Sequence, residues 1–493
     1  MMPSLSIHIL SLALCLSSGF QQGYIASVLN QPYLQMQRFI NDSWLVRTGS
    51  PMKLSTLDMM WSFLNVCFPI AMIFGQFLAA IMCKKIGRRG TALVATAVYV
   101  PATLLSAGAK MCHSFELLYV GRILWSLANG VSSVNATVWI VECAPPQIRG
   151  RMAAMQEFFM AAGALVTQAL GVPFASDTLW PWIFVPNLVF VLASFIMFIF
   201  LYESPQYLMQ KGEEDKARKA LAAYHGVDVD DSSLDAELRI CEEALEKKDA
   251  KQKEKGVGSV TEYDSLTILF MPWKARDPVS QVVRYGAWLG VMVKIAYVFT
   301  GARCLRSYST FVLYSMGGWS HSAALMESLI IGILRLPTTL IPVFLVDRIG
   351  RRPMLIGSTA VCFFSLILMV VGINVGPSFK VATLIGLTTL LLISACGIGS
   401  LSRFYSAELV PRNILLSSVS ILTMFEALTK IGVEFAFYPL ANVIYAQSLL
   451  MFLVPTGIFT IMMWYCPETS RRSVNEVLNE MAQQKKIDVS FLT

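Results

Sequence analysis

The stretch Lys84-Lys85-Ile86-Gly87-Arg88-Arg89-Gly90 decides the fold, because it places four cations and two glycines between two long apolar runs. A hydrocarbon layer rejects such a cluster, so the sequence predicts a tight turn between two membrane helices on the cytoplasmic side, where Lys and Arg collect. The pattern returns at Asp347-Arg348-Ile349-Gly350-Arg351-Arg352-Pro353, again between two apolar runs. The chain is therefore expected to be a membrane protein that contains this basic turn twice.

Other motifs are repeated at nearly the same distance along the chain. The first copies are Glu142 with Pro145 and Arg149, and Glu203-Ser204-Pro205; the second copies are Glu408 with Pro411 and Arg412, and Pro467-Glu468-Thr469. The offset is about 265 residues, which indicates a duplicated half. Two similar membrane halves in one chain are typical of a transporter that works by alternating access about their interface.

The composition agrees with a chain that is dissolved mostly in lipid. Of 493 residues, 55% are hydrophobic and 14% charged, with a mean hydropathy of +0.58. The net charge of +7 comes from basic residues in short turns and one central segment, which is a topology signal and does not indicate nucleic-acid binding. The ten cysteines show neither CxxC nor zinc-finger spacing, so we expect no disulfide framework, no metal site and no cofactor. The chain contains no catalytic constellation, and we do not expect an enzyme.

Twelve apolar runs predict an all-α membrane protein with twelve transmembrane helices in two pseudo-symmetric six-helix halves. The runs lie at about 5–30, 57–82, 92–110, 115–140, 152–175, 180–202, 285–316, 322–346, 354–375, 380–405, 412–440 and 442–464. The first run lacks a basic start and is interpreted as a retained span, not a signal peptide. The expected domains are an N-terminal half (1–202), a cytoplasmic linker with short amphipathic helices (203–284), a C-terminal half (285–464) and a cytoplasmic tail (465–493).

Loop charges set the expected orientation. The loops after the second and fourth spans contain Lys84, Lys85, Arg88, Arg89, Arg149 and Arg151, whereas those after the third and fifth contain only Lys110. The positive-inside rule then places both termini in the cytoplasm, and we expect the plasma membrane as the location. The polar stretch 31–56 would be an external loop, and its Asn41-Asp42-Ser43 triplet is a candidate glycosylation site at Asn41.

The order and spacing of these motifs resemble the sugar-porter branch of the major facilitator superfamily, and within it the facilitative glucose-transporter-like carriers. The resemblance covers nearly the whole chain and also includes Gly75, Gly121-Arg122 and Gly130. It implies a network of cytoplasmic charges that clamps the halves together when the carrier faces outward and parts when it opens inward. The residues expected in this gating network are Arg88, Arg89, Glu142, Arg149, Glu203, Asp347, Arg351, Arg352, Glu408, Arg412 and Glu468. The alternative is that these charges only neutralise the loops and orient helices.

The resemblance also implies a substrate site and a transport mode. Gln168 falls on the family's substrate-binding glutamine, and Gln21, Asn30 and Gln156 fit its pattern of neutral polar residues, although a glutamine in a span is often only a contact between helices. Proton-coupled members have a buried aspartate directly after the Gly-Tyr pair, where this chain has Ile25. Facilitated diffusion is therefore favoured over proton symport.

The second half departs from the family. Tyr297 to Arg303 replaces the family's seventh-span motif Gln-Gln-Leu-Ser-Gly-Ile-Asn, and Gly397 to Arg403 replaces Gly-Pro-Gly-Pro-Ile-Pro-Trp in the tenth span. Six bases enter apolar runs with only three acids: Lys294, Arg303, Arg306, Arg335, Arg403 and Lys430 against Glu327, Glu426 and Glu434. Two interpretations stay open. The charges pair among themselves and lock the bundle, or Arg303, Arg335 and Arg403 converge on the central cavity and select an anionic solute.

The sequence thus predicts a carrier that facilitates diffusion of a small polar solute, with a hexose or related polyol as the default. A carrier of organic anions is the alternative within transport. A receptor or scaffold that has lost translocation is the alternative outside it, because losing the helix breaks near Ser400 and Ser402 would freeze the rocking motion.

Overall fold

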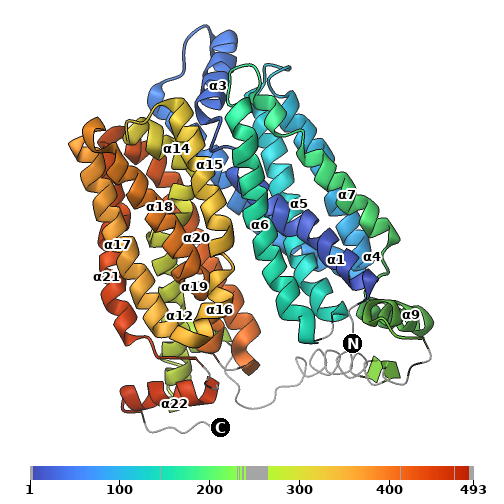
Figure 1. Ribbon diagram of the computed structural model, residues 1–493. Helices are drawn as coiled ribbons and strands as arrows, with labels where there is room; N and C mark the ends of the chain where they lie inside the picture. Colours follow the sequence, from blue (N-terminus) through green and yellow to red (C-terminus); the bar gives the residue numbers. More distant parts are fainter. Residues whose placement is uncertain are drawn as a thin grey trace. The chain divides into compact units, whose positions relative to one another are not determined.

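The computed structural model describes residues 4–144, 146–229, 231, 234–235, 238–239, 265–410, 412–470, 472 and 474–487. Within several helices it describes the backbone but not every side chain; the side chains of 141, 146–151, 153–154, 265–266, 343–344, 346–347, 403–404, 407 and 412–422 lie outside the description. Throughout the described residues, the regular elements are helices (Figure 1).

Eight helical stretches are long and apolar enough to cross a membrane. Two of them contain two helices each: Leu54–Gly108 is divided at Gly87, and Thr423–Tyr465 includes the end of one helix and all of the next. The eight stretches therefore contain ten segments. Two further segments, Phe115–Cys143 and His321–Ile349, are less apolar, and they bring the number of membrane-length segments among the described residues to twelve.

The chain forms two compact units, residues 1–52 with 67–261, and residues 53–66 with 262–493. Residues 57–66 of the second predicted span are therefore grouped with the second unit, and the segment from 203 to 261 with the first. The domain limits expected from the sequence stay a prediction.

The first unit is built from long helices that the predicted runs describe well. Its elements are α1 (Leu5–Leu14), the π-helical turn η1 (Cys15–Gly19), α2 (Phe20–Ser27), α3 (Tyr33–Thr48), most of α4 (Leu54–Gly108), α5 (Phe115–Cys143), α6 (Pro146–Phe174), η2 (Trp180–Ile183), α7 (Asn187–Phe200), α8 (Pro205–Gln210) and α9 (Glu214–His225). One rod, α1 to α2, runs from Leu5 to Ser27 and packs against α6.

The second unit has more breaks within its rods. Its elements are α11 (Ser265–Phe270), α12 (Pro278–Phe299), α13 (Ala302–Ser307), α14 (Ser309–Phe311), η3 (Val312–Met316), α15 (His321–Thr338), α16 (Ile341–Ile349), α17 (Arg351–Val375), η4 (Pro377–Phe379), α18 (Lys380–Cys396), α19 (Ile398–Glu408), α20 (Arg412–Ile444), η5 (Tyr445–Leu449), α21 (Leu450–Met462), η6 (Met463–Tyr465) and α22 (Val474–Gln484).

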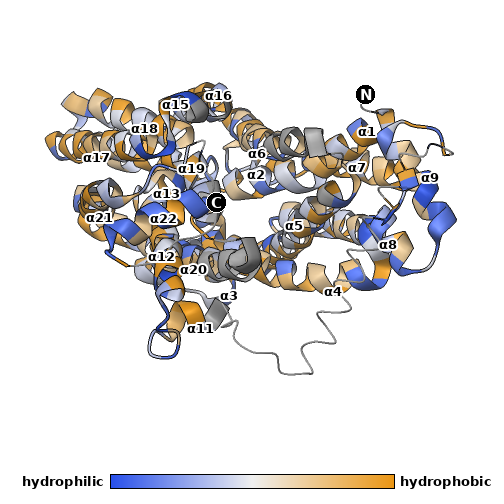
Figure 2. Ribbon diagram, turned by 90° about the horizontal axis from the view of Figure 1, so that it is seen from below, coloured by the Kyte–Doolittle hydropathy of each residue, from blue (hydrophilic) through white to orange (hydrophobic). Residues whose placement is uncertain are grey.

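Short helices occur in the described part of the predicted linker. α8 and α9 are rich in hydrophilic residues, in contrast to the mostly apolar α17 and α18 (Figure 2). α9 buries Ala217, Ala220, Leu221 and Tyr224 on one face, at the spacing of an amphipathic helix. Burial raises the pKa of the Tyr224 hydroxyl well above its ordinary value, so this group stays neutral while it donates to the Tyr202 carbonyl at 2.5 Å.

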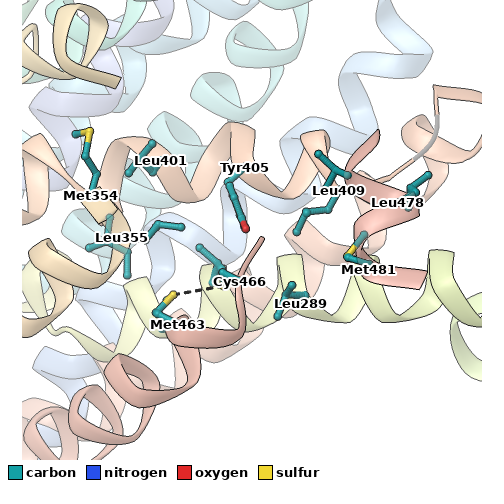
Figure 3. Close-up of a cluster of buried hydrophobic side chains, with 14 of the residues drawn as sticks. Leu289, Met354, Leu355, Leu401, Tyr405, Leu409, Met463, Cys466, Leu478 and Met481 are labelled. Carbon is teal, nitrogen blue, oxygen red and sulfur yellow. Dashed lines mark hydrogen bonds between the residues drawn. The ribbon is translucent and has the colours of Figure 1, made fainter. Parts of the chain in front are cut away.

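The tail contains a helix that the sequence reading did not anticipate. In α22, Val477, Leu478, Met481 and Ala482 form one apolar face that is buried. Figure 3 shows Leu478 and Met481 beside Leu409, in one cluster with Leu289 and Tyr405. The tail is therefore docked on the second unit through a hydrophobic core.

Candidate functional site

The first basic turn is closed by a carboxylate. Gly87 has φ 79° and ψ −179°, so it lies in the left-handed region, and a Cβ there would come within 2.4 Å of Glu203 Oε2. Glu203 Oε1 accepts hydrogen bonds from the backbone N–H groups of Arg88 at 2.8 Å and Arg89 at 3.0 Å. A carboxylate at this position satisfies the free N–H groups of the helix that restarts at Arg88.

A buried ion pair lies beside this turn. The Arg88 guanidinium donates to Glu142 Oε1 at 2.6 Å, and the two side chains are only 7% and 6% exposed. The other oxygen of Glu142 accepts a hydrogen bond from the Ser204 hydroxyl. Three segments, around residues 88, 142 and 203–204, are therefore joined through two carboxylates.

The second unit repeats this arrangement. Gly350 has φ 96°, and Glu468 accepts from the backbone N–H groups of Arg351 at 2.9 Å and Arg352 at 3.0 Å. The Arg351 guanidinium lies 3.3 Å from Glu408, whose second oxygen accepts from the Thr469 hydroxyl at 2.5 Å. This pair is more exposed, at 13% and 29%. The sequence reading missed Ser204 and Thr469, although a hydroxyl residue follows the glutamate in both copies.

The next arginine in each turn forms no ion pair with an acid among the described residues. The Arg89 guanidinium donates to the carbonyl oxygens of Phe198, at 3.0 Å, and Ile199. Arg352 likewise donates to the Trp464 carbonyl at 2.7 Å. Consecutive residues on a helix point about 100° apart, so neighbouring arginines cannot reach the same acid. Each second arginine instead satisfies carbonyls at the end of another helix.

The remaining gating residues cannot be placed. The side chains of Arg149, Asp347 and Arg412 lie outside the described part of the structure. The pair Arg88–Glu142 belongs to the first unit and Arg351–Glu408 to the second. That these residues open and close a gate therefore stays a prediction.

Two of the candidate substrate residues are engaged within the first unit. Gln21 donates to Asn187 at 2.8 Å, and its carbonyl oxygen accepts from Asn187 at 2.9 Å and from Trp125 at 3.1 Å. Gln156 accepts from the backbone N–H of Gly19 at 3.2 Å, at the end of the π-helical turn, while its amide nitrogen is buried without a partner among the described residues. These contacts favour a packing role for Gln21.

Gln168 differs from both. It is 5% exposed, and its carboxamide has no hydrogen bond to any residue that the structure describes. Its amide oxygen and nitrogen are not fully enclosed, so they can bond a ligand or water. Asn30 is also buried, and its backbone N–H bonds the Ser27 carbonyl at 3.1 Å. Of the four, Gln168 is the residue best prepared to accept a polar ligand.

The position of the family's aspartate is apolar and buried. Ile25 is fully buried, and its carbonyl accepts from the Arg122 guanidinium at 2.8 Å. The same guanidinium lies 5.9 Å from the centre of the Phe68 ring. The buried Arg122 guanidinium therefore contacts a carbonyl oxygen and an aromatic face at the position where proton-coupled members of the family have an aspartate.

A cluster of cations lies inside the second unit. Lys294 pairs with Glu426 at 3.3 Å and donates to Thr423 at 3.1 Å, and Arg303 lies 3.9 Å from Glu434. Arg306 lies within electrostatic range of Arg303, Arg335 and Glu434. Arg306 and Arg335 form no ion pair or hydrogen bond with the described residues. The side chain of Arg403 lies outside the description. Pairing thus accounts for part of the charge, and two guanidinium groups form no ion pair with a described acid.

The breaks in the seventh and tenth spans are present, and this corrects our expectation for the tenth. α12 gives way to α13 at Gly301, which has φ 73°. α18 and α19 are separated at Gly397, with φ −116° and ψ −109°, although the family's prolines are absent. The Ser358 hydroxyl accepts from the Ile398 N–H at 3.0 Å and supports this break. The sequence argument for a receptor or scaffold assumed that the tenth span had lost its helix break, and the structure shows that the break is present.

The predicted external loop is also different. Asn41 lies in α3, not in a loop, and its side-chain oxygen accepts from the Met52 N–H at 2.9 Å. Ser43 is buried and donates to the His113 carbonyl at 2.7 Å. Attachment of a glycan requires an accessible triplet, and these contacts disfavour it. Glycosylation at Asn41 stays an untested prediction of the sequence.

Twelve membrane-length helical segments, paired breaks and a duplicated carboxylate-capped arginine turn define a polytopic membrane transport protein. Residues 10–481 match the family described as sugar (and other) transporter. The chain belongs to this family, and it is a multi-pass membrane carrier, not an enzyme.

Relatives in the comparison agree with this family. Solute carrier family 2, facilitated glucose transporter member 7 of Mus musculus is 24% identical, covering 99% of this chain and 91% of the relative. Member 9 of Homo sapiens is 24% identical over 98% of this chain and 86% of its own length.

Solved structures show the same fold. The inward-open xylose transporter XylE from E. coli superposes with a TM-score of 0.74, at 18% identity, over 96% of this chain and 99% of that chain. A D-xylose-proton symporter gives a TM-score of 0.71 at 17% identity, over 95% and 100% of the two chains. The fold is therefore the twelve-helix arrangement of the major facilitator superfamily.

Proposed function

We propose that the protein is a facilitative carrier that moves a hexose or a related polyol down its gradient by alternating access between its two halves. The observation that supports a neutral polyhydroxylated solute is the carboxamide of Gln168, which offers a donor and an acceptor, bonds no described residue and is not fully enclosed by the protein. Family membership supports the same proposal. Both termini are proposed to be cytoplasmic and the plasma membrane is the proposed location, on the strength of the basic turns.

Liposomes that contain the purified full chain test this proposal. Uptake of labelled neutral sugars is measured while an ionophore sets the membrane potential. We expect sugar flux that does not respond to the potential, and a lower flux at low sugar concentration in Gln168→Ala, while Gln21→Ala alters protein stability more than affinity. Absence of flux for every neutral sugar, with the protein still folded, would contradict the proposal.

A second candidate function is transport of a small organic anion. It is favoured by Arg306 and Arg335, whose guanidinium groups are not paired with any described acid in a bundle interior where charge is costly. A guanidinium suits a carboxylate through two parallel hydrogen bonds. An anionic solute would neutralise Arg306 and Arg335, because Glu426 and Glu434 pair with Lys294 and Arg303.

The same liposomes separate the two candidates. Anion flux that follows the membrane potential and falls in Arg335→Gln or Arg306→Gln would support the second function. The matched control is Arg276→Gln, which removes the same charge from an exposed position. If all three variants alter flux equally, the effect is due to net charge, and the anion proposal fails.

A further inference from the structure

A small pocket lies where the last span of the second unit meets the docked tail helix. It has a volume of about 360 Å³ and is lined by Tyr285 of α12, Arg352 of α17, Trp464 and Tyr465 of η6, Cys466, and Gln484 and Lys485 at the end of α22. Residues from four separate helical segments therefore contribute to one site. None of the described lining residues is acidic.

The pocket is at the level of a membrane–water interface. The apolar α21 ends at Met462, and Trp464 and Tyr465 in the η6 turn that follows are 66% and 69% exposed. Exposed Trp and Tyr at the end of a membrane helix are typical of the headgroup region. The basic turn at Gly350 supplies Arg352, so the positive-inside rule assigns this edge to the cytoplasmic leaflet, which contains the anionic lipids.

The two cations of the pocket are oriented by aromatic rings, and acids do not neutralise them. Lys485 Nζ lies 4.3 Å from the centre of the Tyr285 ring, and Arg352 lies 5.8 Å from that of Trp464. Arg352 uses one nitrogen on the Trp464 carbonyl, which leaves further N–H groups of its guanidinium for a ligand. The nearby acids are engaged elsewhere, because Glu468 binds backbone N–H groups and Glu480 pairs with Arg472 at 2.5 Å.

We propose that this pocket binds the phosphate-bearing headgroup of an anionic phospholipid from the cytoplasmic leaflet. Arg352 and Lys485 would hold the phosphate, while Trp464 and Tyr465 lie along the upper acyl chains. Gln484 lines the same pocket; its amide nitrogen donates to Glu480 at 3.4 Å, and its carbonyl oxygen can accept from a headgroup hydroxyl. The bound lipid would tie α22 to the start of α17, next to the second arginine turn. This site is independent of which solute the carrier moves.

Native mass spectrometry of the full chain tests the site. The protein is released from mixed micelles that contain phosphatidylcholine with either phosphatidylserine or phosphatidylinositol 4,5-bisphosphate, and the retained lipid is counted. The key variant is Lys485→Gln, and the matched control is Lys486→Gln, which removes the same charge from the exposed neighbouring residue outside the pocket.

We expect the wild-type protein to retain anionic lipid in preference to phosphatidylcholine. Lys485→Gln should reduce this retention about fivefold, the loss expected for one interfacial lysine. Lys486→Gln should leave it unchanged. Equal loss in both variants would overturn the proposal, because it would show only diffuse attraction between charges. So would equal retention of phosphatidylcholine.

A competition arm distinguishes a lipid headgroup from a soluble anion. Inorganic phosphate and inositol trisphosphate are added before the measurement. If the site binds a lipid, we expect phosphatidylserine to stay bound in the presence of these soluble anions, because its acyl chains add to the affinity. Displacement of the lipid by either soluble anion would overturn the assignment to lipid and point to a soluble phosphate ligand.

Discussion

At the scale of single residues, the two copies of the arginine turn use the same chemistry in different surroundings. Arg88 and Glu142 are almost completely buried, whereas Arg351 and Glu408 keep part of their surface in water. Removing one partner of a buried pair leaves an uncompensated charge, and this costs far more than losing an exposed pair. The first copy is therefore the more sensitive of the two.

We predict that Arg88→Ala destabilises the protein by about 3–5 kcal/mol, because Glu142 stays buried without its partner. Arg351→Ala should cost about 1–2 kcal/mol, since Glu408 is partly hydrated. The control is Arg47→Ala, at the exposed pair with Glu116, which should leave the stability almost unchanged.

Thermal unfolding of the purified variants in detergent measures this ranking. The expected order of melting temperatures is Arg47→Ala, then Arg351→Ala, then Arg88→Ala as the lowest. A similar drop for Arg88→Ala and Arg47→Ala would mean that the Arg88–Glu142 pair is hydrated in solution.

Sequence patterns predicted these residues as a group but not their individual partners. The echo at Glu142 and Glu408 marked the acids that pair with Arg88 and Arg351, each within its own unit, and the network that would link them stays a prediction. It did not show that Arg89 and Arg352 turn toward carbonyl groups, because that depends on helix rotation, which a motif does not specify. In the same way, the spacing of Gln21 could not reveal that Asn187 and Trp125 occupy its carboxamide.

At the scale of elements, helix breaks depend on close approach as much as on proline. The tenth span has lost the family's prolines, yet α18 and α19 are still separated at Gly397. A Cβ on Gly397 would lie 2.2 Å from the Cβ of Ser358 on α17, so only glycine allows these two helices to approach so closely. A proline count therefore could not predict this break.

We predict that Gly397→Ala destabilises the protein by about 1–3 kcal/mol, the usual cost of an overpacked contact. Adding Ser358→Gly should restore part of the loss, because it removes the Cβ that the new methyl group meets. Adding Ser358→Ala should not, since that Cβ stays. Melting temperatures of the single and double variants make the comparison, and equal rescue by Gly and Ala would contradict the contact.

The tail helix offers a second prediction at this scale. Leu478 is fully buried and lies beside Leu409 in the cluster of Figure 3. Leu478→Ala should therefore destabilise the second unit by about 2–5 kcal/mol. The exposed Gln483→Ala in the same helix serves as the control. Protease sensitivity of the tail and the melting temperature provide the measurement, and a tail that is equally protected in both variants would show that α22 is held by other contacts.

At the scale of the whole molecule, duplication made most of the fold predictable. Apolar runs and a repeated basic turn are signals of composition and spacing, and these survive when individual residues change. The solute site gives weaker signals, because it needs only a few polar atoms at positions that each half sets by its packing. The charges of the second unit illustrate this limit: the sequence predicts a surplus, and only geometry distinguishes Lys294, which pairs with Glu426, from Arg306 and Arg335.

The energetics of transport lead to the last prediction. A carrier is driven by protons only if a group that changes its protonation is linked to the alternating states. At the position after Gly23-Tyr24 this chain has Ile25, and Arg122 bonds the Ile25 carbonyl. We therefore expect solute uptake into liposomes to equilibrate without accumulation, and its initial rate to be the same with and without an imposed proton gradient.

Substitution of Ile25 makes this expectation sharper. Ile25→Asp places a carboxyl group near the Arg122 guanidinium, so uptake should become dependent on pH, whereas Ile25→Asn has the same size and polarity without a titratable proton. The measurement is the initial uptake rate of each variant across a series of external pH values at fixed internal pH. Accumulation of solute above its external concentration by the wild-type protein would show that protons drive transport through another group. A pH response in Ile25→Asn equal to that of Ile25→Asp would show that polarity at this position, and not proton exchange, controls the rate.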